Sequence, residues 1–136
     1  MKELELKGYK ITETEFTNKI NGSVKLELTH KYNHNVSYSN NGTCRALMKL
    51  TVSDKTHPEN FSLGVSLEGL FQIKESIPKE KIHVLTYDFL FPFLKAFVSA
   101  FSSLSGIPPI LIPYVDISDK AIYRVDFPNI NGGNLQ

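Results

Sequence analysis

One apolar segment dominates this chain: LTYDFLFPFLKAFVSAFSSLSGIPPILIPYV, residues 85–115. It contains seven of the 15 aromatic side chains and four of the seven prolines, but one lysine and no arginine. Any stable fold must bury most of this segment, because apolar surface is excluded from water. A chain of 136 residues can form one domain with a core of its own, but not two. We therefore expect a single domain over residues 1–136.

The first half of the chain, residues 1–73, shows the period of two that is typical of β-strands. Apolar side chains alternate with polar ones in SVKLELTH, in TCRALMKLTVS and from Phe61 to Ile73. In ELELKGYKITETEF the apolar positions change parity at Gly8, which predicts a bulge. The stretch KYNHNVSYSNNG is rich in Asn and Ser and ends in the turn dipeptide Asn41-Gly42, so we expect a connection there. Together these segments predict a meander of four antiparallel strands with one apolar face.

The apolar segment is the cover that we expect for this face, in an α+β fold. Pro92 fits the first turn of a helix, and Gly106 followed by Pro108 supplies a stop. Asp88 would then lie at the start of the helix, as a cap or as a charge that complements the helix dipole. The predicted parts are an antiparallel sheet at 1–73, a helical segment at 84–105, a proline-rich loop at 106–117 and a short C-terminal segment at 118–136.

The predicted helix is more apolar than a single sheet requires. Its polar positions form one narrow stripe, whereas an apolar stripe of about a third of the circumference is enough to cover a sheet. A membrane span is one interpretation, but the prolines and Gly106 interrupt the run before it reaches about 20 residues. Two other interpretations remain. The helix could lie between its own sheet and an identical subunit, or part of its apolar surface could form a groove that accepts other chains. The pattern alone leaves both open.

Charge and motifs argue against several classes of protein. The 15 basic and 14 acidic side chains nearly cancel without a basic run, so we expect no nucleic-acid partner. MKELELKGYK lacks the apolar core of a secretory signal, which predicts a cytoplasmic protein. The lone Cys44 is interpreted as a core residue. His30 and His34 have a spacing that could ligate a metal on a helix, but the surrounding asparagines indicate a loop. No phosphate-binding loop or nucleophile motif is present, so we expect no enzyme, no catalytic residue, no metal and no cofactor.

Two stretches resemble the SecB family of bacterial protein-export chaperones. LEGLFQI, residues 67–73, is similar to the family's strand that ends in a glycine and an Ile/Leu-Phe pair. LFPFLKAFVSAFSSLSGIPPILIPYVDI, residues 90–117, is similar to its Leu-Phe-Pro helix and proline-bearing loop, and VKLEL at 24–28 falls in the order of its second strand. The resemblance implies a four-stranded antiparallel sheet on a long helix, in a homodimer or homotetramer. It further implies a chaperone that holds unfolded preproteins in apolar grooves without ATP.

The resemblance also suggests residues and partners. The partners would be unfolded polypeptides, with the SecA motor or an antitoxin as a further partner. At the outward positions of the predicted strands, basic residues (Lys25, Arg45 and Lys49) are mixed with acidic ones (Glu27 and Glu68). No residue is therefore assigned to a contact with SecA. The family continues after the loop into a second helix, whereas DISDKAIYRVDF allows barely two helical turns. This difference favours two alternatives: a dedicated chaperone of a toxin–antitoxin system, or a SecB-fold oligomeric adaptor that is not a chaperone. The implied client groove comprises Phe61, Phe71, Ile110, Leu111, Ile112 and Tyr114, and the implied oligomer interface comprises Phe93, Phe97, Ala100, Phe101 and Leu104.

Overall fold

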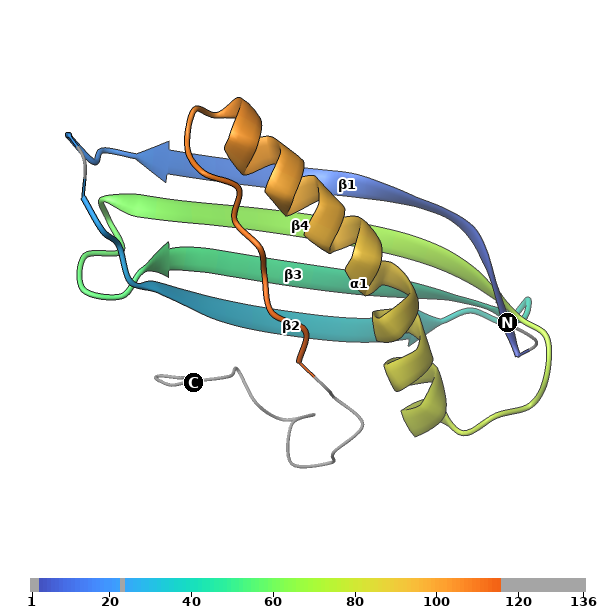
Figure 1. Ribbon diagram of the computed structural model, residues 1–136. Coiled ribbons are helices and arrows are strands. Elements are labelled where there is room, and N and C mark those ends of the chain that lie inside the picture. The colour runs from blue at the N-terminus through green and yellow to red at the C-terminus, as the bar shows by residue number, and fades with distance from the viewer. Residues whose placement is uncertain (1–2, 23, 116–136) are drawn as a thin grey trace.

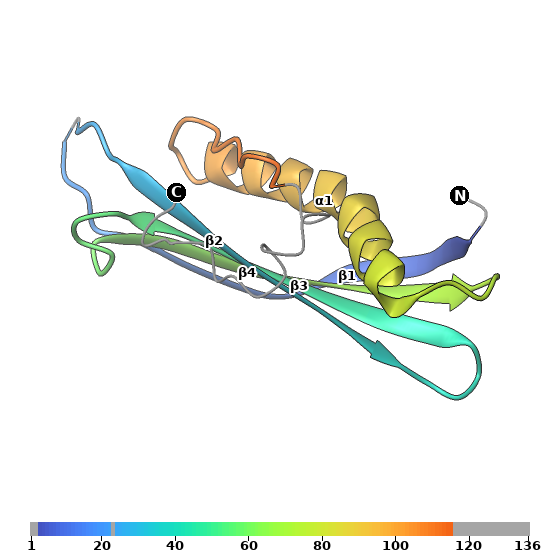
Figure 2. The same cartoon turned by 90° about the horizontal axis from the view of Figure 1, so that it is seen from below.

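The computed structural model describes residues 3–22 and 24–115, which form two layers (Figures 1 and 2). One layer is a four-stranded antiparallel sheet, and the other is a long helix on one of its faces. After the helix, residues 107–115 return across the same face without helix or strand, and we call this segment the strap. The predicted α+β fold is confirmed. The elements are β1 (Leu4–Asn18), β2 (Leu28–Tyr38), β3 (Thr43–Asp54), β4 (Phe61–Ile73) and α1 (Lys79–Leu104).

The strand order is β1-β4-β3-β2, so the predicted meander is wrong. β1 pairs with β4 along its length, and the connection at 19–27 passes the ends of β4 and β3 to reach β2 (Figure 1). β2, β3 and β4 are neighbours both in the sequence and in the sheet, and β1 lies beside β4. This is a Greek-key arrangement. It puts the two strands with the strictest apolar alternation, β3 and β4, in the centre of the sheet. The more polar β1 and β2 form the edges.

β2 occupies the stretch that we expected to be a connection. It pairs residue by residue with β3, from Leu28 opposite Asp54 to Tyr38 opposite Cys44. The predicted strand at 23–30 is therefore displaced, because residues 24–27 have no regular structure. An edge strand needs only one apolar face, so Asn and Ser can fill its solvent face. The predicted Asn41-Gly42 turn is confirmed, with Gly42 at φ 80°.

β1 contains two irregularities that keep its apolar side chains on the helix side. The register shifts between Leu6 and Gly8, where the bulge was predicted, and again between Ile11 and Glu13, where none was predicted. Each shift inverts the parity of the strand, since an extra residue moves the following side chains to the other face. As a result Leu6, Ile11 and Phe16 all pack toward the core.

α1 begins at Lys79, earlier than the predicted start at 84, and Pro92 lies inside it. The placement of Pro92 in the first turn, and of Asp88 at the helix start, is therefore wrong. A proline inside a helix removes one backbone hydrogen bond, and here its ring lies on the exposed side. The predicted stop is confirmed, because Gly106 adopts φ 89° and its N–H donates to Ser103 O while Ile107 N–H donates to Ser102 O. These two bonds form a Schellman motif.

Within the described residues, α1 is long and apolar enough to cross a membrane by length and composition alone. The expectation that the prolines shorten the run below that length is wrong, because Pro92 does not end the helix. The core helix of a soluble protein meets the same criterion. α1 packs on its own sheet, through the buried side chains Ile82, Thr86, Tyr87, Leu90, Phe91, Leu94, Val98 and Ser102.

α1 crosses the sheet diagonally, from β2 near its N-terminal end to β1 near its C-terminal end (Figure 1). The helix comes close to β4 at Gly69, where a Cβ would lie 2.8 Å from Leu90 Cδ2 and 3.1 Å from Phe71 Cε1. Glycine therefore sets the distance between helix and sheet at this crossing. The diagonal leaves two flanks of α1 that do not face the sheet, one toward β2 and one toward β1.

Candidate functional site

The strap lies along the β2 flank of α1 and is seated by alternate side chains. Ile110 and Ile112 point inward and are 8% and 2% exposed, whereas Leu111 and Tyr114 are 68% and 51% exposed. Burying an aliphatic side chain of this size contributes about 1.5–3 kcal/mol. The strap is thus held by its two isoleucines and presents Leu111 and Tyr114 to solvent.

Three side-chain hydrogen bonds fix the strap. Near its start, Ile110 N–H donates to Ser102 Oγ at 2.8 Å, and Ser102 in turn donates to Val98 O. At its far end, Tyr32 Oη donates to Pro113 O at 2.6 Å, and Tyr114 Oη donates to Asp88 Oδ1 at 2.5 Å. Burial, and then the neighbouring Tyr87, raise the pKa of Tyr32, so its hydroxyl remains a donor.

An aromatic cluster lies beneath the far end of the strap. The ring of Tyr114 is 5.2 Å from Phe91, in an edge-to-face arrangement, and 5.9 Å from Tyr87. Tyr32 on β2 approaches Phe91 at 6.5 Å. Rings bury a large area with few rotatable bonds, so this cluster is a rigid apolar support for the strap, with Tyr114 on its exposed side.

A buried polar contact joins β2 to α1 beside the cluster. His34 Nε2 lies 2.9 Å from Thr86 Oγ1, and the Thr86 hydroxyl donates to Ile82 O. Since that hydroxyl hydrogen is already used, we assign the proton of His34 to Nε2. Burial, and then the nearby His83, lower the pKa of His34 to about 3. The histidine is therefore a neutral structural group near pH 7.

The histidines do not form a metal site. Among residues 3–22 and 24–115, no three His, Cys, Asp or Glu side chains lie close enough together to hold a metal ion. His30 and His34 lie on the helix-facing side of β2, and burial lowers the pKa of His30 as well. Cys44 is buried, as predicted, and burial raises the pKa of its thiol. A raised pKa leaves little thiolate, the form that acts as a nucleophile.

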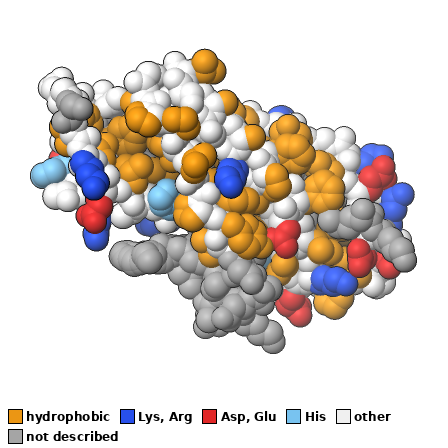
Figure 3. All heavy atoms as spheres, viewed as in Figure 1, with side chains coloured by type: hydrophobic (Ala, Val, Ile, Leu, Met, Phe, Trp, Pro, Cys, Tyr) orange, Lys and Arg blue, Asp and Glu red, His pale blue; other side chains and the backbone are white. Residues whose placement is uncertain are grey.

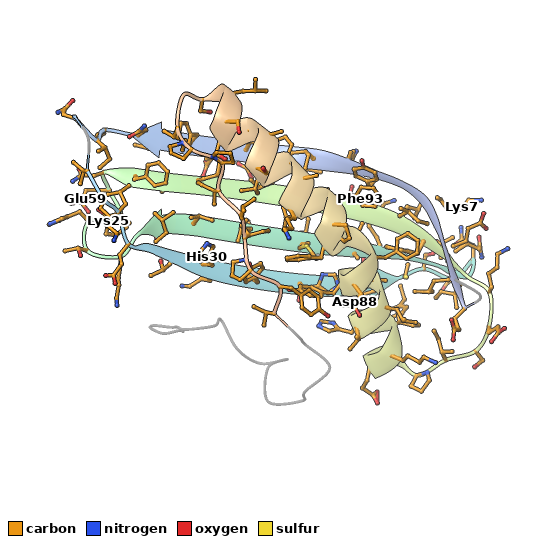
Figure 4. The ribbon with its side chains drawn as sticks, viewed as in Figure 1. Lys7, Lys25, His30, Glu59, Asp88 and Phe93 are labelled. Carbon is orange, nitrogen blue, oxygen red and sulfur yellow. The ribbon has the colours of Figure 1, made fainter. Side chains whose placement is uncertain are left out.

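The β1 flank of α1 carries a row of phenylalanines. Phe93 stacks on Tyr9 of β1 with ring centroids 4.3 Å apart, and Phe97 stacks on Phe101 at 5.8 Å. Figure 4 shows Phe93 on the β1 side of the helix and Asp88 on the β2 side. Of the predicted interface, Phe93, Phe97 and Phe101 are half-buried, and Ala100 and Leu104 are exposed. Their role in assembly stays a prediction.

The predicted groove residues divide into core and surface. Phe61 and Phe71 are buried on the helix-facing side of β4, and Ile110 and Ile112 are buried beneath the strap, so none of these four offers much surface here. Leu111 and Tyr114 are exposed next to α1. Figure 3 shows hydrophobic side chains spread over this face, with charged groups gathered mainly at the ends of the sheet. The groove assignment stays a prediction, supported at the surface by Leu111 and Tyr114.

Several residues of this site were missed by the sequence analysis. Tyr32 and His34 lie in the stretch taken for a connection, although they alternate with asparagines as an edge strand would. Ser102 was grouped with the polar stripe of the helix, but it is buried and binds the strap. The predicted loop at 106–117 is described only to residue 115, and the C-terminal segment at 118–136 lies outside the described residues.

The opposite face of the sheet is polar and of mixed charge. Glu68 lies 3.3 Å from Arg45 and 4.0 Å from Lys10. Lys25 and Glu27, which we expected on a strand, lie in the connection before β2. This face therefore offers paired charges and not an acidic surface.

The arrangement of strands and helix defines a SecB-like fold. No protein-family model matches the sequence, and no curated protein matches it. Among solved structures, the chain resembles the SecB-like chaperone Rv1957 of Mycobacterium tuberculosis, determined in complex with a ChAD peptide from the Rv1956 HigA1 antitoxin. The TM-score is 0.68, the identity is 9%, and the match covers 83% of this chain and 91% of that chain. The predicted SecB-like fold is confirmed at the level of architecture.

Proposed function

We propose that this protein is an ATP-independent cytoplasmic holdase that binds unfolded polypeptide segments on the apolar surface around α1 and the strap. The observation that carries the proposal is the apolar surface left over once α1 has covered its sheet. Leu104, at the end of α1, is 89% exposed, and Leu111 and Tyr114 on the strap are 68% and 51% exposed. Exposed apolar surface of this kind is typical of interaction sites.

The chemistry of this surface suits an unfolded client. It consists of aliphatic and aromatic side chains with the single carboxylate of Asp88 and the ammonium of Lys95 nearby, so it can bind many sequences by burial alone. Each client side chain contributes little, but several contacts along one chain act together because their effective concentration is high. No bound nucleotide or metal is needed for such binding.

A dedicated client is favoured over general export. The similar fold of Rv1957 was determined with a peptide of an antitoxin, which supports an antitoxin as the client of a protein of this shape. The mixed charge around Glu68 gives no support to a handover to SecA. We propose that the protein is the chaperone of a toxin–antitoxin system, with the general preprotein holdase as the alternative.

The proposed assembly is a homodimer or homotetramer formed through the β1 flank of α1. In that case Ala100→Arg, at an exposed position of the flank, should convert the assembly to smaller species in analytical ultracentrifugation. Lys95→Glu, which changes a charge on a different side of the helix, should not. Equal masses for the wild type and Ala100→Arg would refute this interface.

The proposed function is tested by suppression of aggregation. Reduced α-lactalbumin is allowed to unfold and aggregate, and light scattering is followed with and without the protein. If the protein is a general holdase, wild type should suppress scattering at near-stoichiometric ratio, and Leu111→Asp should lose most of this effect. If it is a dedicated chaperone, the same difference between the two proteins should appear only when the aggregating client is the antitoxin encoded beside it. The matched control is Leu47→Asp, which introduces the same charge at an exposed leucine on the opposite face of the sheet.

The outcomes separate the classes of protein. Suppression of α-lactalbumin aggregation indicates a general holdase. Suppression restricted to an antitoxin encoded beside the protein indicates a dedicated chaperone. If neither client is bound, the apolar surface serves assembly alone and the protein is an oligomeric adaptor. Equal loss of suppression in Leu111→Asp and Leu47→Asp would show that the surface around the strap is not the site.

A further inference from the structure

The strap is an extended chain seated on an apolar surface of its own protein. Ile110 and Ile112 occupy that surface at alternate positions, with Leu111 directed to solvent between them. An extended polypeptide presents its side chains in this alternation. The seat beneath the strap is thus already shaped for an extended segment with aliphatic side chains two residues apart.

The backbone of the strap is bound loosely to the rest of the fold. Beyond Ile107, it makes no backbone–backbone hydrogen bond with any described residue, and the Ile110 amide is satisfied by the side chain of Ser102. Pro108, Pro109 and Pro113 have no N–H, so these positions cannot join a β-ladder. Because no ladder has to break, the strap can leave its seat without disturbing the sheet.

Two tyrosine hydroxyls hold the far end of the strap. Tyr32 donates to Pro113 O and Tyr114 donates to Asp88, and we call this pair of hydrogen bonds the latch. The latch joins the strap both to β2 and to the solvent side of α1. Its two bonds lie at the end opposite the Schellman turn at Gly106, which is where a hinge would be placed.

We propose that the strap is a lid that competes with the client, and that the latch keeps it closed over the client's seat. When the latch opens, the isoleucines withdraw and the client's own aliphatic side chains take their place, while Leu111 on the opened strap stays in contact with the client. This inference rests on the proposed function and adds its regulation and its preferred segment. That segment is an extended chain with aliphatic residues at alternate positions and a hydroxyl or a cation near Asp88.

A closed lid lowers the apparent affinity for the client by the fraction of molecules that are open. Each hydrogen bond removed from the latch should therefore lower the apparent Kd about fivefold, as long as the closed state still dominates. This is the opposite of what a strap that simply lines the groove would show. Loosening a lining segment would weaken binding.

The test uses the full chain and the double variant Tyr32→Phe/Tyr114→Phe, which keeps both rings and removes both hydroxyls. Hydrogen–deuterium exchange reports the strap, in a peptide spanning residues 107–115. Fluorescence anisotropy reports client binding, with two labelled clients: reduced and carboxymethylated α-lactalbumin, and the antitoxin encoded beside the protein. Asp88→Asn is a second, milder variant at an exposed helix position. Tyr38→Phe is the matched control, since it removes a β2 hydroxyl that does not contact the strap.

We expect faster exchange of the strap and a Kd about tenfold lower or more in the double variant, a smaller change in Asp88→Asn, and no change in Tyr38→Phe. Faster exchange with an unchanged or higher Kd would refute the lid and leave the proposed function intact. Unchanged exchange in the double variant would show that the latch does not hold the strap, and would also refute the inference. Lack of binding of both α-lactalbumin and the antitoxin by every variant would refute the proposed function together with the lid.

Discussion

His34 links β2 to α1 as a neutral base, and its burial makes the stability of the fold depend on pH. Its pKa is about 3 in the folded protein, against 6.5 for an ordinary histidine. A lowered pKa means that the unfolded chain binds this proton and the folded protein does not. The stabilisation is therefore complete above pH 6.5, and it is lost as the pH falls from 6.5 toward 3.

The size of the effect follows from the two pKa values. At pH 5 the proton on His34 favours the unfolded state by about 2 kcal/mol, and at pH 7.5 by almost nothing. Burial also lowers the pKa of His30 and of His83, so these residues add to the loss in the same direction. A substitution at His34 alone isolates its share.

The substitution is His34→Gln, whose amide can still donate to Thr86 but does not titrate. Urea unfolding of both proteins is followed by circular dichroism at pH 7.5, 6 and 5, at one protein concentration because assembly would shift the midpoint. The wild type should lose about 2 kcal/mol more than the variant between pH 7.5 and pH 5. Equal losses in the two proteins would mean that His34 is not a buried neutral base, and the assigned contact with Thr86 would be wrong.

Three further predictions concern the packing of the helix and strap. Gly69→Ala should destabilise the fold by about 1–3 kcal/mol in urea unfolding, because its Cβ would meet Leu90, whereas Gly64→Ala in the same strand has only Leu50 O at 4.0 Å and should cost nothing. Leu90→Ala should cost about 2–5 kcal/mol and Leu104→Ala less than about 0.5 kcal/mol, since the first is buried and the second exposed. Ser102→Ala should cost about 1–3 kcal/mol and speed amide exchange at the start of the strap, because Ile110 N–H loses its acceptor.

The central strands could be predicted from the sequence and the edge strand β2 could not. In β3 and β4 the helix-facing positions are almost all apolar, so the alternation is strong. In β2 the helix-facing positions include His30, Tyr32 and His34, and the solvent positions include two asparagines. Its strand conformation comes from pairing with β3, a tertiary effect that overrides weak β-propensity. The strand order was missed for the same reason, because the connections alone do not distinguish a meander from a Greek key.

The start of α1 was missed because a local rule was applied to Pro92. Proline is favoured in the first turn of a helix, where its missing N–H costs nothing. Here the turns before Pro92 are held on the sheet by Ile82, Thr86 and Tyr87, which are all buried. That packing offsets one lost hydrogen bond, and the helix continues through the proline. The helix end could be predicted, because Gly106 and the prolines after it act locally.

The apolar excess seen in the sequence is divided between the two flanks of α1, and under the proposed function this division would separate assembly from client binding. On the β2 flank, the strap covers the helix with Ile110 and Ile112, and in the proposed lid it would be exchanged for another extended chain. On the β1 flank, Phe93 and Phe97 have only Tyr9 and Phe101 as ring partners within the described residues. A rigid row of rings on a regular helix suits a permanent partner of fixed shape. A seat under a displaceable strap suits a chain that has no fixed shape. In the proposed protein, the same helix would join subunits on one side and hold an unfolded client on the other, so that neither surface interferes with the other.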